Sequence, residues 1–405
     1  MLRVDGFAGS DVHPDVQRPR PPLTVGERGL AAPLRRVLTP GTPSNRILRI
    51  GLLMLAVAVG LRAFALLILN HPLGVDLEIP LRAAERWVNG DVVYDPAAFE
   101  LTGGPDLPYL YPPAVLPFLV PLLALPRELV LVAWVLVCLG SAIWALRRLR
   151  TPWLVVPILL IWPPFTEGWL GGNVHMLLLA LFVSMFIAPG SGAPDMHPVS
   201  RDPAATTEPL VRRGLQASLI AVFKVSQVHP WLYQLRYRPS SALAGAAILG
   251  AIVLVTVPVT GLGLWGEWLD QVRRAADTTW IIGGIGLGRM VAPAVGAVVA
   301  IASLVAVLFV PRKDTGAWVG VLSVVGGTSL RGYGLTFMLP AGYRIRRELA
   351  LIAYAMAGTF TAPGAWLGIA MVAIAWVVGQ RFRVLLEPDP ARADPDLVPA
   401  LPAAS

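Results

Sequence analysis

Residues 47–69, ILRIGLLMLAVAVGLRAFALLIL, form the first long apolar run of the chain, and an acidic stretch, Gly74-Val75-Asp76-Leu77-Glu78, follows them. A run of this length crosses a bilayer as a helix, since about 20 apolar residues span the hydrocarbon core. A carboxylate just beyond the end of a span is costly to keep near lipid, which makes it a functional candidate. The sequence therefore predicts a membrane protein with Asp76 at the exit of its first helix.

The remaining sequence has the composition of a protein with many membrane helices. Its mean hydropathy is +0.65, and of its 405 residues 55% are hydrophobic and 14% charged. Apolar runs of this kind exclude an ordinary soluble domain. The net charge of +8 comes from short basic clusters between those runs, which are typical of cytoplasmic loop anchors and argue against nucleic-acid binding. We expect an all-α polytopic membrane protein with roughly ten to thirteen membrane segments.

The two ends of the chain differ from its middle. Residues 1–46 are rich in arginine and proline and cannot bury a core, so we expect a disordered cytoplasmic tail. Residues 385–405, rich in proline, alanine and aspartate, predict a disordered C-terminal tail. Residues 47–384 are then one transmembrane domain.

Placing the basic clusters on the cytoplasmic side predicts a long outward loop over residues 71–111. Within it, residues 77–89 have helical spacing of apolar positions, which predicts an amphipathic helix at the membrane surface. A second such helix is expected over residues 265–280. Residues 214–235 and 316–343 are too short for two spans each. Each is either a broken or re-entrant helix lining a cavity, or one ordinary span.

Metal and cofactor sites are not expected. Cys138 is the only cysteine, and the five histidines are scattered without the spacing of a zinc site.

Ionisable residues beside or within apolar runs are the candidate site residues. Asp76 is a candidate general base, the alternative being a solvated loop acid. Lys224 ends the apolar run Ala221-Val222-Phe223-Lys224 and needs an anionic partner, either a substrate phosphate or a neighbouring helix. Arg289 and Arg331 can each grip two phosphate oxygens, or else anchor the chain at the membrane interface.

Three further residues have two interpretations each. Glu78 supports the site or faces water on the amphipathic helix. His175 hydrogen-bonds a sugar hydroxyl or caps its own helix, and His229 is a second base or a hydrogen-bonded core histidine.

These motifs resemble glycosyltransferase family 87, the polyprenyl-phosphate-mannose-dependent alpha-mannosyltransferases, over roughly residues 47–380. The resemblance begins with the aspartate after the first span and continues with Tyr94-Asp95-Pro96 and Tyr111-Pro112-Pro113. It also includes Gly172-Asn173-Val174-His175, where the family has Gly-Gln-x-Asn, and the run that ends in Lys224. The sequence departs from the family at residues 329–334, Ser-Leu-Arg-Gly-Tyr-Gly, where the family has a histidine-containing segment.

The resemblance implies a C-type membrane glycosyltransferase fold and an inverting, metal-independent hexosyltransferase. By the same resemblance the donor is polyprenyl phosphate mannose, and the acceptor is a glycolipid or lipoglycan of the cell envelope. The active site would face outward from the cytoplasmic membrane. In such a reaction Asp76 takes the proton of the acceptor hydroxyl while cations stabilise the departing phosphate.

Two alternatives remain open at this point. A transporter or flippase of a glycolipid also has buried charges and broken helices. A catalytically silent relative that only binds glycolipid is suggested by the missing histidine.

Overall fold

The computed structural model of the chain describes residues 42–70, 72–100, 107–186, 210–224, 227–278, 286–311, 314–327, 330–359, 361–382 and 385–386. The chain divides into two units, residues 1–50 and residues 51–405. The described part of the first unit, residues 42–50, contains the opening turns of α2. Most of the two expected tails, residues 1–41 and 387–405, lies outside the described residues.

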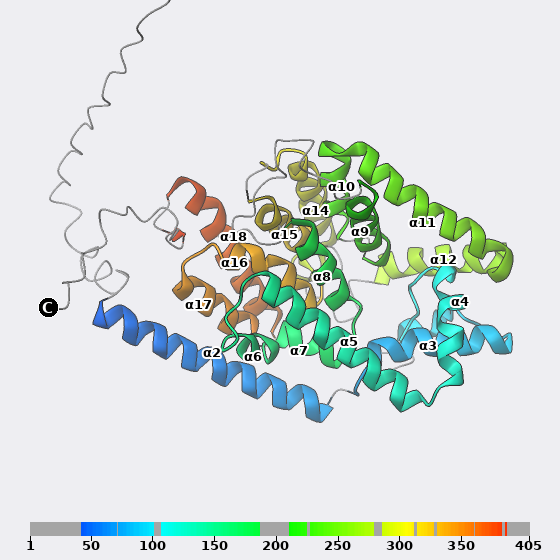
Figure 1. Ribbon diagram of the computed structural model, residues 1–405, viewed down its shortest axis with the longest axis horizontal. Helices are drawn as coiled ribbons and strands as arrows, with labels where there is room; N and C mark the ends of the chain where they lie inside the picture. The colour runs from blue at the N-terminus through cyan, green and yellow to red at the C-terminus, as the bar shows by residue number, and fades with distance from the viewer. Residues whose placement is uncertain are drawn as a thin grey trace, which may run out of the picture. The chain divides into compact units, whose positions relative to one another are not determined.

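The described residues form helices of very different lengths (Figure 1). The longer ones are α2 (Pro43–Asn70), α3 (Val75–Asn89), α5 (Arg127–Arg148), α8 (His175–Phe186), α9 (Leu210–Phe223), α11 (Pro239–Thr260), α12 (Leu262–Thr278), α14 (Pro293–Val307), α15 (Thr315–Val325), α17 (Arg347–Ala357) and α18 (Ala362–Arg381). The shorter ones are α4 (Leu116–Leu119), α6 (Val156–Leu160), α7 (Pro163–Leu170), α10 (His229–Tyr237), α13 (Leu287–Met290) and α16 (Leu339–Gly342), with 3-10 helices η2 (Pro96–Glu100), η3 (Pro113–Val115), η4 (Val120–Ala124) and η7 (Gly332–Met338).

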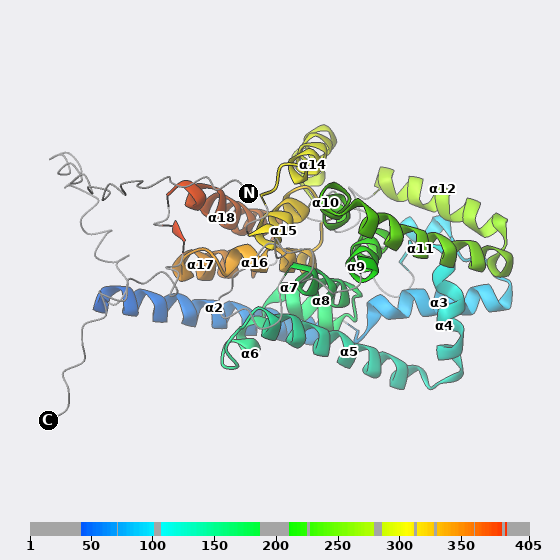
Figure 2. The same ribbon diagram turned by 45° about the horizontal axis from the view of Figure 1, so that its top comes forward.

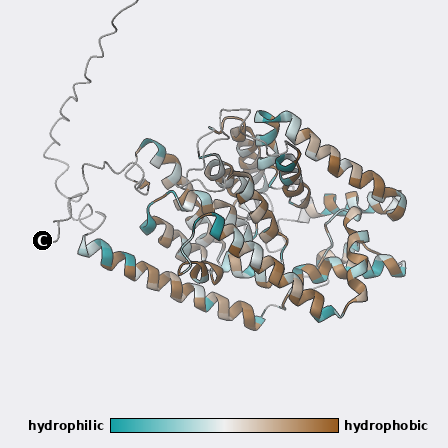
Figure 3. Ribbon diagram, viewed as in Figure 1, coloured by the Kyte–Doolittle hydropathy of each residue, from teal (hydrophilic) through white to brown (hydrophobic). Residues whose placement is uncertain are grey.

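Four helical segments in the described residues are long and apolar enough to cross a membrane: Pro43–Asn89, α5, α11 and α18. A fifth crossing results if α7 and α8, which are bent by 116° to each other, count as one broken span. Brown, hydrophobic positions cover most of α2, α5 and α11 (Figure 3). These features are compatible with an all-α membrane protein, while the expected ten to thirteen segments and the C-type architecture stay predictions.

The outward surface of α11 is apolar. Leu243, Leu254 and Val255 are exposed to 57%, 73% and 73%. Large aliphatic side chains in such numbers are costly in water, but they suit a surface that faces lipid.

The amphipathic helix predicted over residues 77–89 is present as α3. It begins after Gly74, whose positive φ of 71° favours glycine, and ends at Gly90, whose φ is 78°. Its apolar residues, among them Leu77 and Leu81, are buried against α4, η4 and α5. The apolar face thus packs on protein. The second predicted surface helix is present as α12.

The two stretches that were too short for paired spans are both broken. One is divided between α9 and α10, and the other into α15, η7 and α16. The alternative of single ordinary spans is therefore wrong. Backbone that leaves the helix at membrane depth is tolerated where protein encloses it or where it lines a cavity, so the breaks are the places to look for a site.

The core lies where α5, α8, α15 and η7 meet. Phe182 of α8 and Phe337 of η7 are fully buried, with their ring centroids 4.7 Å apart. Aromatic contact at this distance contributes beyond the buried area alone. η7 is thereby fixed against α8 next to the break that follows α15.

Glycines allow α9 and α11 to cross at backbone contact. A Cβ added to Gly214 of α9 would lie 1.6 Å from the carbonyl oxygen of Ser241, and one added to Gly245 of α11 would lie 2.2 Å from the carbonyl carbon of Gly214. Figure 2 shows the two helices beside each other. Small residues commonly permit such close approach between membrane helices. The crossing fixes α9, whose last turn leads to Lys224.

Residues 385 and 386, the first two of the expected C-terminal tail, are paired with the segment before α17. Arg346 N–H donates to Leu385 O at 3.0 Å, and Ile345 and Leu386 form an isolated antiparallel bridge. This pairing lies at the predicted boundary between the membrane domain and the C-terminal tail.

Candidate active site

The start of α3 is hydrogen-bonded to the bend between α7 and α8, residues 171–174, which we call the elbow. Asp76, the second residue of α3, donates its backbone N–H to Gly171 O at 2.8 Å, and Gly74 donates to Leu170 O at 2.9 Å. The Asn173 side chain donates from Nδ2 to Asp76 Oδ2 at 2.8 Å. The elbow therefore fixes both the backbone and the carboxylate of Asp76.

Local interactions explain why the chain bends at this elbow. Gly172 has a φ of 69°, which a residue with a side chain rarely adopts. Asn173 Oδ1 accepts the backbone N–H of His175 at 2.9 Å, as an asparagine at a helix start commonly does. Trp134 of α5 donates to Gly172 O at 2.6 Å, and Cys138 Sγ approaches Asn173 O at 3.6 Å. The carbonyls that the break leaves without helical partners thus bond to side chains of α5.

Lys224 follows the last residue of α9 and points to η7. Its Nζ donates to the hydroxyl of Tyr333 at 3.1 Å and lies 4.7 Å from the centre of that ring. The side chain of Asn173 lies beside the same hydroxyl. Asp76 with Asn173 and Lys224 with Tyr333 therefore form two hydrogen-bonded pairs, which meet where the Asn173 amide approaches the Tyr333 hydroxyl.

Two more charged residues complete a group that we call the charged cluster: Asp76, Glu167, Lys224 and Arg331. Glu167 belongs to α7, and Arg331 directly precedes η7. The charge of Asp76 acts on Lys224 and Arg331, and the charge of Glu167 acts on both cations as well. All four residues keep partial exposure. The cluster therefore brings two carboxylates and two cations together at partly exposed positions.

Tyrosines of the first loop border the cluster. Tyr94 donates its hydroxyl to Tyr111 O at 2.8 Å, and the ring of Tyr111 meets Phe223 edge-on at 5.8 Å. Burial, opposed in part by the charge of Lys224, raises the pKa of Tyr111 to about 12. The phenol therefore stays protonated at neutral pH and keeps its O–H donor.

The predicted site residues lie in different parts of the structure. Asp76, Lys224 and Arg331 come together in the charged cluster. His175 lies beside it, fully buried, with its ring 5.3 Å from that of Tyr333. Its burial places it against the ring of Tyr333 and not at an open sugar subsite. The backbone of Arg289 belongs to α13, but its side chain lies outside the described residues.

Glu78 and His229 have other partners. Glu78 forms ion pairs with Arg127 at 2.8 Å and with Arg82 at 3.1 Å. The imidazole of His229 hydrogen-bonds Ser303 of α14 at 2.9 Å and is 1% exposed. Glu78 thus links α3 to α5, and the environment of His229 matches the core-histidine interpretation.

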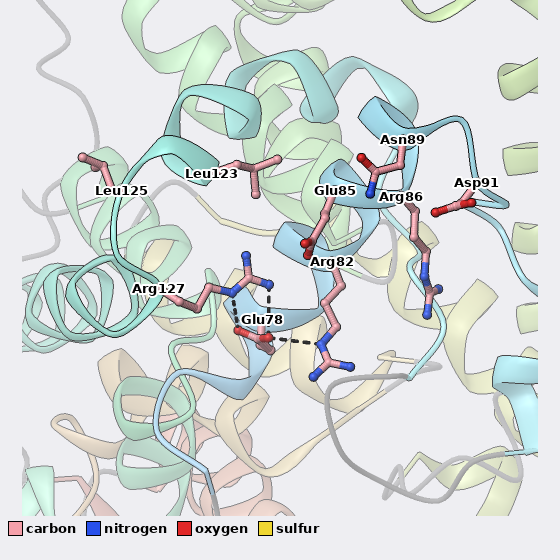
Figure 4. Close-up of a pocket in the computed structure, with 9 residues that line it drawn as sticks. All are labelled: Glu78, Arg82, Glu85, Arg86, Asn89, Asp91, Leu123, Leu125 and Arg127. Atoms are coloured by element: carbon pink, nitrogen blue, oxygen red, sulfur yellow. Dashed lines mark hydrogen bonds and ion pairs between the residues drawn. The ribbon is translucent and has the colours of Figure 1, made fainter.

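Two surface grooves lie along α3. The first, of about 550 Å³, is lined by Glu78, Arg82, Glu85, Arg86, Asn89, Asp91, Leu123, Leu125 and Arg127 (Figure 4). The second, of about 580 Å³, is lined by Trp87, Gly90, Asp91, Val92, Val93, Tyr94, Pro96, Leu264, Glu267, Asp270, Gln271 and Arg274. The charged cluster contributes to neither lining. The chemistry of the site is thus separate from these two grooves.

Sequence reasoning missed Glu167, Asn173 and Tyr333 as site residues. Glu167 is a carboxylate inside the apolar sequence Pro163–Leu170, the same signal that pointed to Lys224. Asn173 and Tyr333 stood in motifs that were noticed, but only the fold shows that Asn173 bonds Asp76, that Tyr333 bonds Lys224 and that the two side chains adjoin.

Comparison with known proteins gives one family match. The family model described as glycosyltransferase family 87 matches residues 109–293. That stretch contains Glu167, Asn173 and Lys224. No curated protein and no solved structure matches the chain.

Proposed function

We propose that the chain is a membrane glycosyltransferase of family 87, whose model matches residues 109–293, and that it moves a hexose, mannose by resemblance, from a polyprenyl-phosphate donor to a glycolipid or lipoglycan acceptor. The observation that carries this proposal is the charged cluster, in which the Asp76 carboxylate interacts electrostatically with the cations Lys224 and Arg331. A carboxylate and two cations are the groups that transfer from a lipid phosphate requires.

In the proposed reaction the acceptor oxygen attacks the anomeric carbon from the face opposite to the phosphate. Asp76 takes the hydroxyl proton, the new C–O bond forms, and the bond between the sugar and the phosphate oxygen breaks. Its electron pair remains on the phosphate, whose charge Lys224 and Arg331 stabilise. Attack from the opposite face inverts the anomeric centre. The sugar passes through an oxocarbenium-like transition state, as in glycoside hydrolysis.

The active site faces outward from the cytoplasmic membrane, in accord with basic clusters on the opposite side of the predicted topology. Residues 47–384 form the catalytic membrane domain, between tails at residues 1–46 and 385–405. The product belongs to the glycolipids of the cell envelope.

The experiment that tests the proposal uses purified protein in liposomes with a mannosylated glycolipid acceptor. Labelled polyprenyl phosphate mannose should give labelled glycolipid, and a labelled nucleotide mannose should give none. Transfer from the nucleotide sugar alone contradicts the proposed donor. Movement of glycolipid across the bilayer without transfer favours the transporter, and donor binding without turnover favours the silent relative.

Replacing Lys224 by glutamine should raise the KM for the lipid-phosphate donor by about tenfold or more, since a hydrogen bond to a charged group contributes about 1.5–3 kcal/mol. Lys224→Arg keeps the charge and should retain part of the lost affinity. Donor KM values from initial rates check both variants. An unchanged KM in Lys224→Gln would separate this lysine from the phosphate.

Replacing Gly332 by alanine should lower transfer about tenfold or more without unfolding the protein. The new Cβ would lie 2.3 Å from Glu167 Oε2, closer than atoms can approach. Because the carboxylate ends a flexible side chain, Glu167 can move aside, which alters the charged cluster and spares the fold. Transfer rates and melting curves in detergent check this. Gly342→Ala is the matched control, since its Cβ would meet nothing within 4 Å.

A further inference from the structure

Two hydrogen-bond donors face the hydroxyl oxygen of Tyr333. One is Lys224 Nζ at 3.1 Å, and the other is the side-chain amide of Asn173. The orientation of this amide is fixed, because Asn173 Oδ1 accepts the N–H of His175 at 2.9 Å while Nδ2 donates to Asp76 at 2.8 Å. The amide nitrogen therefore points to the side on which Asp76 and Tyr333 lie.

This arrangement determines what the hydroxyl can still do. A phenolic oxygen has two lone pairs and one proton. Lys224 Nζ occupies one lone pair of Tyr333 and the Asn173 amide lies beside the other, so the group that the hydroxyl still offers is its O–H donor. In the described part of the chain, no side-chain or backbone acceptor receives that proton. An ammonium that donates to a hydroxyl also polarises it and makes it a stronger donor.

The ring of Tyr333 is held in place. The residue is 7% exposed, and the ring of His175 lies 5.3 Å away on one side. The glycine on its C-terminal flank is equally confined, because a Cβ on Gly334 would lie 2.7 Å from the Leu330 side chain. A donor held this firmly needs little reorganisation when a ligand arrives, which is what stabilises developing charge most effectively.

Charges of both signs surround the hydroxyl of Tyr333. Lys224 bonds it directly and the charge of Arg331 acts on it. The carboxylates of Asp76 and Glu167 act on it as well. On the side of the two cations, a phosphate oxygen suits the polarised O–H better than a neutral sugar hydroxyl, since hydrogen bonds to charged groups are about twice as strong.

We propose that Tyr333 donates a hydrogen bond to a phosphate oxygen of the lipid-phosphate donor, beside Lys224 and Arg331. This inference rests on the proposed function. It adds a neutral phosphate-binding group to the two cations. Because the Asn173 amide lies beside the hydroxyl and also holds Asp76, the proposed phosphate contact and the base adjoin the same side chain.

The test compares Tyr333→Phe with wild type by equilibrium titration of short-chain polyprenyl phosphate, the product that carries the phosphate without the sugar. Phenylalanine keeps the ring contacts and removes only the hydroxyl. Affinity should fall about ten- to a hundredfold, the range for a hydrogen bond to a charged group. The KM for the acceptor should not change. Tyr237→Phe is the matched control, because that hydroxyl donates to Val310 O at 2.8 Å in another part of the fold.

The outcomes separate this inference from the function on which it rests. Equal binding of polyprenyl phosphate by Tyr333→Phe and wild type would overturn the inference alone. A raised acceptor KM with unchanged phosphate affinity would also overturn it and assign the hydroxyl to the acceptor. If the wild type binds polyprenyl phosphate but transfers no hexose, the proposed function is rejected. The titration of Tyr333→Phe still tests whether the hydroxyl contacts the phosphate.

Stability is measured in parallel so that loss of fold is recognised. If Tyr333→Phe melts early, Tyr333→His, which retains a ring and an N–H donor, supplies the second comparison. It should recover part of the lost affinity. Equal loss in both variants would mean that ring packing and not a hydrogen bond is responsible, and the proposal would fail.

Discussion

Transfer of labelled hexose should fall by about 10² to 10⁴ when Asp76 is replaced by asparagine, the range that a positioned general base contributes. The amide has nearly the shape of the carboxylate and can still accept the hydrogen bond that Asn173 now gives to Asp76 at 2.8 Å. It cannot take up the acceptor proton. The site should thus stay assembled and lose its chemistry. Initial rates with polyprenyl phosphate mannose in liposomes measure the effect.

A matched control and a binding measurement complete the test of Asp76. Asp270→Asn changes an exposed aspartate of α12 that pairs with Arg273 at 2.9 Å, and its rate should equal that of wild type. The Asp76→Asn protein should still bind polyprenyl phosphate, because the cations remain. Undiminished transfer by Asp76→Asn would remove this residue as the base.

Replacing Gly214 by alanine should destabilise the protein by about 3 kcal/mol or more, at the upper end of what overpacking costs. The added Cβ would lie 1.6 Å from Ser241 O and 2.5 Å from its carbonyl carbon. Backbone atoms inside a helix cannot move aside as a side-chain end can. α9 and α11 must therefore separate. Melting temperature in detergent and yield of folded protein measure the loss.

Gly250→Ala is the control for this prediction. Gly250 lies in α11, the other helix of the crossing, but a Cβ there would meet nothing within 4 Å. Alanine has the higher helix propensity, so this variant should match or exceed wild type in stability. If Gly214→Ala and Gly250→Ala melt alike, the two helices do not cross at backbone contact.

Features that depend on neighbouring residues were predictable from the sequence. The apolar run over residues 47–69 predicted α2. The spacing over residues 77–89 predicted α3, and the lengths of the two short stretches gave broken helices as one of two alternatives. Each of these signals needs only the local sequence, since periodicity, glycine, proline and run length act within one element.

Contacts between distant residues were not predictable in this way. Asp76 and Asn173 are separated by 97 residues, and Lys224 and Tyr333 by 109. Support of the site was one of two interpretations of Glu78, because it lies two positions after Asp76. Its carboxylate instead accepts a hydrogen bond from Arg127, 49 positions further along the chain. A helix directs successive side chains to different sides, so closeness in sequence does not place two groups in one site.

The family match and the fold contribute different parts of the candidate site. The matched stretch, residues 109–293, includes Glu167 and Lys224 but not Asp76 or Arg331. Only the fold brings those last two into the charged cluster. The assignment to a family and the assembly of the cluster are therefore separate observations, and the proposed function draws on both.

The contact of α5 with the elbow has a mechanical consequence. Trp134 and Cys138, one turn apart on this candidate span, hold the carbonyls of Gly172 and Asn173, and Asn173 holds Asp76. A span adjusts its tilt to the thickness of the hydrocarbon layer around it. Because α5 is joined to the elbow in this way, a change in its tilt would move the carbonyls on either side of Asn173 and so displace the Asp76 carboxylate.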